Sequence, residues 1–120
     1  MNQEKIICSA IHIYLTDKFE KQPIGIEQGF VISGRRHSDC YAILDCMSML
    51  SGFTNKVVKE LVNSILRKHQ GFITNHNRYV NRKEAAIIAH KANQMLQPAF
   101  YCEGYELTSE DLFLDLYQNQ

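Results

Sequence analysis

The hydrophobic and polar positions in the first part of the chain predict two strands. Residues 5–15 are rich in isoleucine and partly alternate with polar residues, as in a strand of a half-buried sheet. Residues 16–27 carry several charges and Pro23, which predicts a loop. A second strand is predicted over residues 29–33, after which Gly34 allows the backbone to turn.

Helical spacing of apolar residues begins after this turn. The pattern predicts a helix that is capped by Ser38 or Asp39 and ends near Gly52. A second helix is predicted from about residue 56 to residue 69, with an apolar stripe on one side and lysines on the other. Gly71 lies just beyond it, as expected of a helix stop.

The next stretch predicts a hairpin and a third helix. Residues 72–74 and 78–80 flank a turn whose asparagines tolerate left-handed geometry. Asn81 is the predicted helix cap, with Glu84 three residues later, and the helix is expected to continue to Leu96 before Pro98. Its alanine-rich face suits close contact with another helix or another subunit.

The last residues, 107–113, predict a short terminal helix that docks on the body through Leu112, Phe113 and Leu116. These elements together predict an α+β fold, in which two or three helices pack on one face of a small antiparallel sheet. A chain of 120 residues is long enough for one domain with one core, and no linker is visible, so residues 1–120 are expected to form a single domain.

Charge and hydropathy narrow the classes of partner. Thirteen basic residues balance thirteen acidic ones, which argues against broad electrostatic binding to duplex nucleic acid or to an anionic membrane. The apolar stretch near the start is too short for export or for a bilayer span. We therefore expect a cytoplasmic protein.

The cysteines and histidines do not predict a metal site. Four cysteines occur without a CxxC pair, and five histidines occur without a spacing typical of ligands. Buried thiols in a reducing compartment are the expected state of the cysteines. Neither a metal nor another cofactor is predicted.

Two segments resemble each other and both contain arginines. QGFVISGRRH (residues 28–37) is echoed by QGFIT and NRYVNR (residues 70–74 and 77–82). Each joins a short apolar strand to guanidinium groups near the start of a helix, where backbone N–H groups attract anions. In a chain without net charge, this pattern predicts a small anionic ligand, with phosphate as the first candidate.

The first segment offers Arg35, Arg36 and His37. Neighbouring residues at a strand end point to opposite sides, so one arginine can face a pocket while the other faces solvent or a partner. Guanidinium is permanently charged and binds phosphate oxygens in a bidentate manner. The alternative is a solvated basic turn in which His37 is a cap, a stacking ring or simply exposed.

In the second segment, Arg78 and Arg82 flank a junction between strand and helix, where the amides favour negative charge. The alternative is that Asn81 serves only as a cap and that both arginines are surface residues. Phe72 can stack on a nucleobase or belong to the core. Both readings stay open from the sequence.

Catalytic motifs are weak. No Ser-His-Asp signature, glycine-rich phosphate loop or metal motif is present. Glu110 and Asp111 suit a cap and a helix dipole better than a pair of general bases. The sequence therefore favours binding over catalysis, and the protein is not expected to be an enzyme.

These motifs resemble those of a widespread group of small phage proteins. The matching parts are GRRH at residues 34–37, GFIT, NRYVNR and KEAA within residues 71–86, and SEDL at residues 109–112, followed by Phe113 where the group has tyrosine. The layout also resembles that of the phage Thoeris anti-defence sponge proteins, the first family described of that name.

This resemblance implies a non-catalytic protein in the cytoplasm of an infected bacterial host. Such sponges sequester cyclic ADP-ribose isomers made by TIR-domain immune enzymes, and some take up cyclic di- or trinucleotides. They form homo-oligomers, dimers that can assemble into hexamers, with pockets between subunits. The long predicted helix over residues 56–69 departs from the pattern and puts the hexamer in doubt.

Carried onto this sequence, the resemblance implies arginines that grip a pyrophosphate, an aromatic ring that stacks on adenine, and an aspartate that accepts from a ribose hydroxyl. The implied ligand-binding residues are Arg35, Arg36, His37, Phe72, Asn77, Arg78, Asn81, Arg82 and Asp111.

Other functions remain open from the sequence. The protein can be a small phosphodiesterase or glycohydrolase that degrades such signals. It can also inhibit a host factor through the alanine-rich helix, or serve as a phage structural or regulatory subunit.

Overall fold

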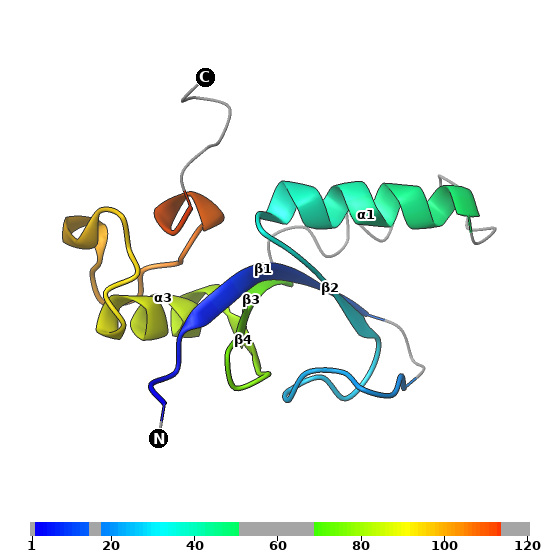
Figure 1. Ribbon diagram of the computed structural model, residues 1–120, viewed down its shortest axis with the longest axis horizontal. Helices are drawn as coiled ribbons and strands as arrows, with labels where there is room; N and C mark the ends of the chain where they lie inside the picture. The colour runs from blue at the N-terminus through cyan, green and yellow to red at the C-terminus, as the bar shows by residue number, and fades with distance from the viewer. Residues whose placement is uncertain (1, 15–17, 51–68, 114–120) are drawn as a thin grey trace.

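The structure is a computed structural model that describes residues 2–14, 18–50 and 69–113 (Figure 1). The helix expected over residues 56–69 falls almost entirely outside these residues, as does Leu116. The described elements are β1 (Ile6–Ile13), β2 (Phe30–Gly34), α1 (His37–Leu50), β3 (Gln70–Thr74), β4 (Tyr79–Asn81), α3 (Arg82–Lys91) and the 3-10 turns η1 (Pro98–Phe100) and η2 (Ser109–Asp111). The fold is α+β, as predicted.

The four strands form one antiparallel sheet in the order β2-β1-β3-β4. Ser9 of β1 lies opposite Gly34 of β2 on one side and Phe72 of β3 on the other. This central position of β1 brings the end of β2 close to the start of β3, although the two are far apart in sequence. A bulge between Ile6 and Cys8 places Ile6 on the same face as Phe72.

The two described α-helices, α1 and α3, pack on one face of the sheet, which confirms the predicted layering. Cys40 and Leu44 of α1 cover the isoleucines of β1 and β2. The side chains of α3 cover Phe72 and Val80. In Figure 1, α1 lies above the sheet, while the segment of residues 18–29 that leads into β2 lies below the sheet.

The third helix is shorter than predicted. Asn81 is its cap, and its side-chain oxygen accepts from the backbone N–H of Glu84 at 2.8 Å. The expected continuation to Leu96 is wrong, because α3 ends at Lys91 and Asn93 adopts a φ of 57°. Gln94 instead exchanges two side-chain hydrogen bonds with the backbone of Ile6, at 2.8 and 2.7 Å.

The alanine-rich face of α3 is used inside the chain. Ala85, Ala86 and Ala89 are fully buried in a cluster with Phe72 and Leu107. The small side chains let α3 approach the sheet closely. These alanines therefore pack on the sheet and the terminal segment of their own chain, where the sequence had suggested another helix or another subunit.

The hairpin and the terminal segment follow their predictions. Asn77 adopts a φ of 56° in the turn between β3 and β4. Thr108 and Asp111 form a reciprocal cap around η2. Leu112 is buried and Phe113 packs against the same cluster, as expected for a docked tail.

The cysteines only partly match the expectation of buried thiols. All four are free; Cys40 is buried and Cys8 is partly buried, but Cys46 and Cys102 are exposed. Burial raises the pKa of the Cys40 thiol to about 12, so this group is inert at neutral pH.

Candidate functional site

An open cleft of about 500 Å³ lies where α1, β3, α3 and η2 begin. We call it the helix-start cleft. The sheet order explains the convergence, since β1 holds the end of β2 beside the start of β3. Its lining residues are His37, Ser38, Gln70, Arg82, Thr108, Ser109 and Glu110.

His37 is held in a defined orientation at this cleft. Its Nε2 donates to the backbone oxygen of Gly71 at 2.9 Å, and its ring lies edge-on to Phe72 with centroids 5.0 Å apart. Burial lowers the pKa of His37, and the positive charge of Arg82 lowers it further. His37 is therefore neutral near pH 7, which leaves Nδ1 as a hydrogen-bond acceptor.

Arg82 lines the cleft, Arg36 contacts the lining residue Glu110, and each arginine lies near an exposed carboxylate. Nη2 of Arg36 is 3.5 Å from Glu110, whose side chain is 69% exposed. Nη1 of Arg82 is 3.5 Å from Glu106, whose side chain is 53% exposed. Charge-assisted hydrogen bonds are usually about 2.7–2.9 Å long, so these ion pairs are loose. Such pairs at a surface contribute little and can exchange for another anion.

One further contact fixes the direction of Arg82. Its Nε donates to the backbone oxygen of Leu107 at 2.9 Å, and the N–H of Leu107 donates to the backbone oxygen of Arg82 at 3.0 Å. The segment before η2 is thereby fastened to the start of α3. The guanidinium is held in place while its outer nitrogens remain near the cleft.

Arg78 lies at the end of β3 and β4 that is remote from the cleft, and its contacts there hold parts of the fold together. It donates to both oxygens of Glu4, at 3.0 and 2.8 Å, and to Glu84 at 2.6 Å. These bonds from Arg78 are the main reason that the pKa of Glu4 falls to about 2. The arginine thus joins the N-terminal segment, the hairpin and α3, and it does not line the helix-start cleft.

Several other predicted residues have structural contacts away from the cleft. Phe72 is fully buried, so the expectation that its ring stacks on a ligand is wrong. Asn77 shapes the hairpin turn, and Asn81 caps α3. The guanidinium of Arg35 lies 5.1 Å from the centre of the Phe113 ring.

Asp111 is also engaged within the chain. One of its oxygens accepts from the N–H of Thr108 at 2.8 Å, and both oxygens accept from the hydroxyl of Tyr105 at 2.9 Å. It does not line the cleft, so its expected contact with a ribose hydroxyl is not supported. Of the nine predicted residues, the structure brings His37 and Arg82 into the cleft lining, with Arg36 at its border through Glu110.

Most polar residues that line the cleft were not predicted from the sequence. Ser38, Gln70, Thr108, Ser109 and Glu110 supply hydroxyl, amide and carboxylate groups. Ser109 and Glu110 belong to the SEDL motif, which could have indicated them. Gln70 was not identified because it belongs to an apolar strand segment. Its side chain also donates to the hydroxyl of Tyr41 at 2.8 Å.

Within residues 2–14, 18–50 and 69–113, no three His, Cys, Asp or Glu side chains are grouped so that they could hold a metal ion. Over the same residues, no helix combines the length and the apolar character needed to cross a membrane.

Comparison with known proteins identifies a phage family. A family model described as phage T4 y16D protein matches residues 5–113. No curated protein matches the chain. No solved structure matches it either.

Proposed function

The chain belongs to the phage T4 y16D protein family, and we propose that it binds a small phosphorylated nucleotide in the helix-start cleft and holds it without cleaving it. One observation carries the proposal. Arg82 lines the cleft, Arg36 contacts the lining residue Glu110, and each guanidinium lies 3.5 Å from an exposed carboxylate that a phosphate can displace.

The size and the polar groups of the cleft suit such a ligand. A volume of about 500 Å³ lies within the range of small-molecule sites. Two fixed cations can neutralise two phosphate charges, and hydroxyls from Ser38, Thr108 and Ser109 can donate to phosphate oxygens. Neutral His37 adds an acceptor for a ribose hydroxyl or a base N–H.

The finer proposal is an anti-defence sponge, which the motifs described above suggest. Its ligand is a cyclic ADP-ribose isomer, or also a cyclic di- or trinucleotide, and its site of action is the cytoplasm of the infected host. The pyrophosphate lies between Arg36 and Arg82 in this proposal. With Phe72 buried, the imidazole of His37 is the ring left to contact adenine. A homo-oligomer completes the pocket.

A thermal-shift screen of the purified protein against cyclic nucleotides tests binding. A ligand at about 100 times its Kd stabilises a protein by about 2.7 kcal/mol, which is readily seen as a rise in Tm. The variant Arg82→Gln is expected to lose the rise. Lys83→Gln, an exposed neighbour on α3 that removes the same charge, is the matched control and is expected to keep it.

The fate of the ligand separates a sponge from an enzyme. We expect a cyclic ADP-ribose isomer to be recovered intact after the complex is heat-denatured. Recovery of a linear or cleaved product would instead make the protein a phosphodiesterase or glycohydrolase. If no nucleotide raises the Tm of the wild-type protein, the proposed function is wrong.

A further inference from the structure

A second, smaller cleft lies on the face of the sheet opposite the helices. Its volume is about 220 Å³, and its lining residues are His12, Tyr14, Gly25, Glu27 and Gln28. We call it the His12 cleft. Ile11 and Ile13 pack under α1, so the side chain of His12 points to the other face, where Tyr14, the residue after β1, also lines the cleft. No residue lines both clefts.

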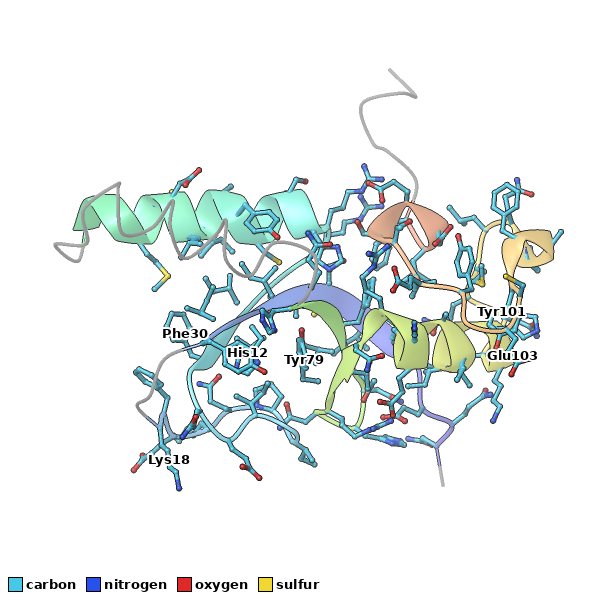
Figure 2. All side chains as sticks on the ribbon, turned by 180° about the vertical axis from the view of Figure 1, so that it is seen from behind. His12, Lys18, Phe30, Tyr79, Tyr101 and Glu103 are labelled. Carbon is cyan, nitrogen blue, oxygen red and sulfur yellow. The ribbon has the colours of Figure 1, made fainter. Side chains whose placement is uncertain are left out.

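The rings of His12 and Tyr14 line this cleft, and two further aromatic rings pack against them. The ring of His12 lies 4.2 Å from that of Tyr14 and 5.8 Å from that of Tyr79, measured between centroids. The ring of His69 lies 4.2 Å from that of Tyr14. Figure 2 shows His12 and Tyr79 side by side beneath the sheet. Tyr14 is 49% exposed, so part of its ring is open to a ligand.

The opposite wall is a loop that is held at two points. Ile24 exchanges backbone hydrogen bonds with β4 and its turn, at 2.8 Å to the oxygen of Asn77 and 2.9 Å from the N–H of Tyr79. Four residues later, the backbone oxygen of Gln28 accepts from Nε2 of His12 at 2.7 Å. Residues 25–27 therefore span a fixed gap, and the cleft exists before any ligand arrives.

The charge in this cleft is negative. Glu27 is the carboxylate among its described lining residues, which include no lysine or arginine, and Glu27 is exposed. Lys18 belongs to the same connection, but Figure 2 shows its side chain directed away from His12. Aromatic faces attract cations, and a nearby carboxylate strengthens that attraction. This chemistry is the opposite of that in the helix-start cleft.

We propose that the His12 cleft binds a small alkylammonium ion, with the charged head between Tyr14 and Glu27. The methylene or methyl groups of the ion would lie against the rings of Tyr14 and His12. The carboxylate of Glu27 disfavours a phosphate, because no lysine or arginine is among the described lining residues to offset the repulsion. The proposal stands apart from the proposed function, since it rests on different residues.

A titration with butylammonium or tetramethylammonium, followed by NMR shifts of the tyrosine rings, tests the proposal. We expect saturable binding that Glu27→Gln and Tyr14→Ala each weaken by about fivefold or more, as expected for loss of a carboxylate or of a cation–π contact. Tyr14→Phe keeps the ring and is expected to bind like the wild type. Circular dichroism confirms that each variant is folded.

Glu103→Gln is the matched control for net charge, because Glu103 is exposed beside Tyr101, far from His12 (Figure 2). It should leave the titration unchanged. Equal binding of neutral butanol, or an unchanged titration in Glu27→Gln, would overturn the proposal. Tighter binding of adenosine than of either cation would also overturn it, because a nucleobase would then be the ligand.

Discussion

His37 joins the start of α1 to β3 by donating from Nε2 to the backbone oxygen of Gly71, at 2.9 Å. Gly71 also has the ring of Tyr79 lying across it on the other face of the sheet. One short strand thus supports both clefts, the helix-start cleft through His37 and the His12 cleft through Tyr79.

The pKa of His37 predicts how stability depends on pH. Burial lowers this pKa below 6.5, so below that pH the unfolded state takes up the proton more readily than the folded state. The contribution to the free energy of unfolding is complete above pH 6.5 and is lost as the pH falls through the folded-state pKa.

Urea denaturation of the wild type and of His37→Gln between pH 7.5 and 5 measures this effect. The difference in stability between the two proteins should shrink as the pH falls. A difference that stays constant across this range would show that His37 does not titrate as its burial implies.

The close contacts around Gly71 predict that adding one methyl group at this position lowers the stability of the protein substantially. A Cβ at this position would collide with the backbone oxygen of Val80 and lie 2.6 Å from Cζ of Tyr79. Gly71→Ala should therefore destabilise the protein by about 1–3 kcal/mol, as overpacked sites do.

Gly104→Ala is the contrasting variant. Nothing lies within 4 Å of a Cβ there, but φ is +82°, so its cost comes from backbone strain alone, about 1 kcal/mol. Chemical denaturation compares the two. A Gly71→Ala protein as stable as the wild type would mean that the Tyr79 ring does not lie across this glycine.

The ion pairs of Arg78 predict a loss of stability in acid. The pKa of Glu4 is lowered from 4.5 to about 2, first by hydrogen bonds from Arg78, so this stabilisation is present above pH 4.5 and is lost as the pH falls toward 2. Arg78→Gln should cost about 1–2 kcal/mol at pH 7, a figure that allows for the partial exposure of the pair.

Lys83→Gln removes the same charge from an exposed site on α3 and should change stability little. Urea denaturation at pH 7 and at pH 3 distinguishes the two variants. Equal stability losses at both pH values would argue against the role of Glu4.

If a phosphate displaces the carboxylate of Glu110 from Arg36, removing that carboxylate should raise the affinity for the nucleotide. If the proposed function is correct, Glu110→Gln removes one carboxylate that competes with the phosphate for Arg36, and it should tighten nucleotide binding by about two- to fivefold, the scale of an exposed ion pair. Isothermal titration measures the change, with Glu103→Gln as the control that raises the net charge equally.

A weaker complex in Glu110→Gln would indicate that this carboxylate contacts the ligand directly. If the wild type binds the nucleotide and Glu110→Gln binds it with the same affinity, the proposed function stands. That result would disprove only the competition between Glu110 and the phosphate for Arg36.

Much of the fold could be predicted because its signals are local. Alternating isoleucines predicted β1, the asparagines of residues 75–77 predicted the hairpin turn, and Asn81 was identified as a cap three residues before Glu84. The end of α3 was misplaced, because the hydrogen bonds of Gln94 to Ile6 join residues 88 positions apart. A pattern of neighbouring residues contains no information about such a contact.

The sequence alone determined the strands, the turns, the caps and the presence of arginines near helix starts, since each depends on residues within a few positions. Only the tertiary structure decided which arginines share a cleft. Arg78 and Arg82 are four residues apart, yet the first is held by Glu4 at the hairpin while the second lies with His37 and Glu110. The physical reason is that strand pairing and long-range ion pairs, rather than spacing along the chain, select the partners of a charged side chain.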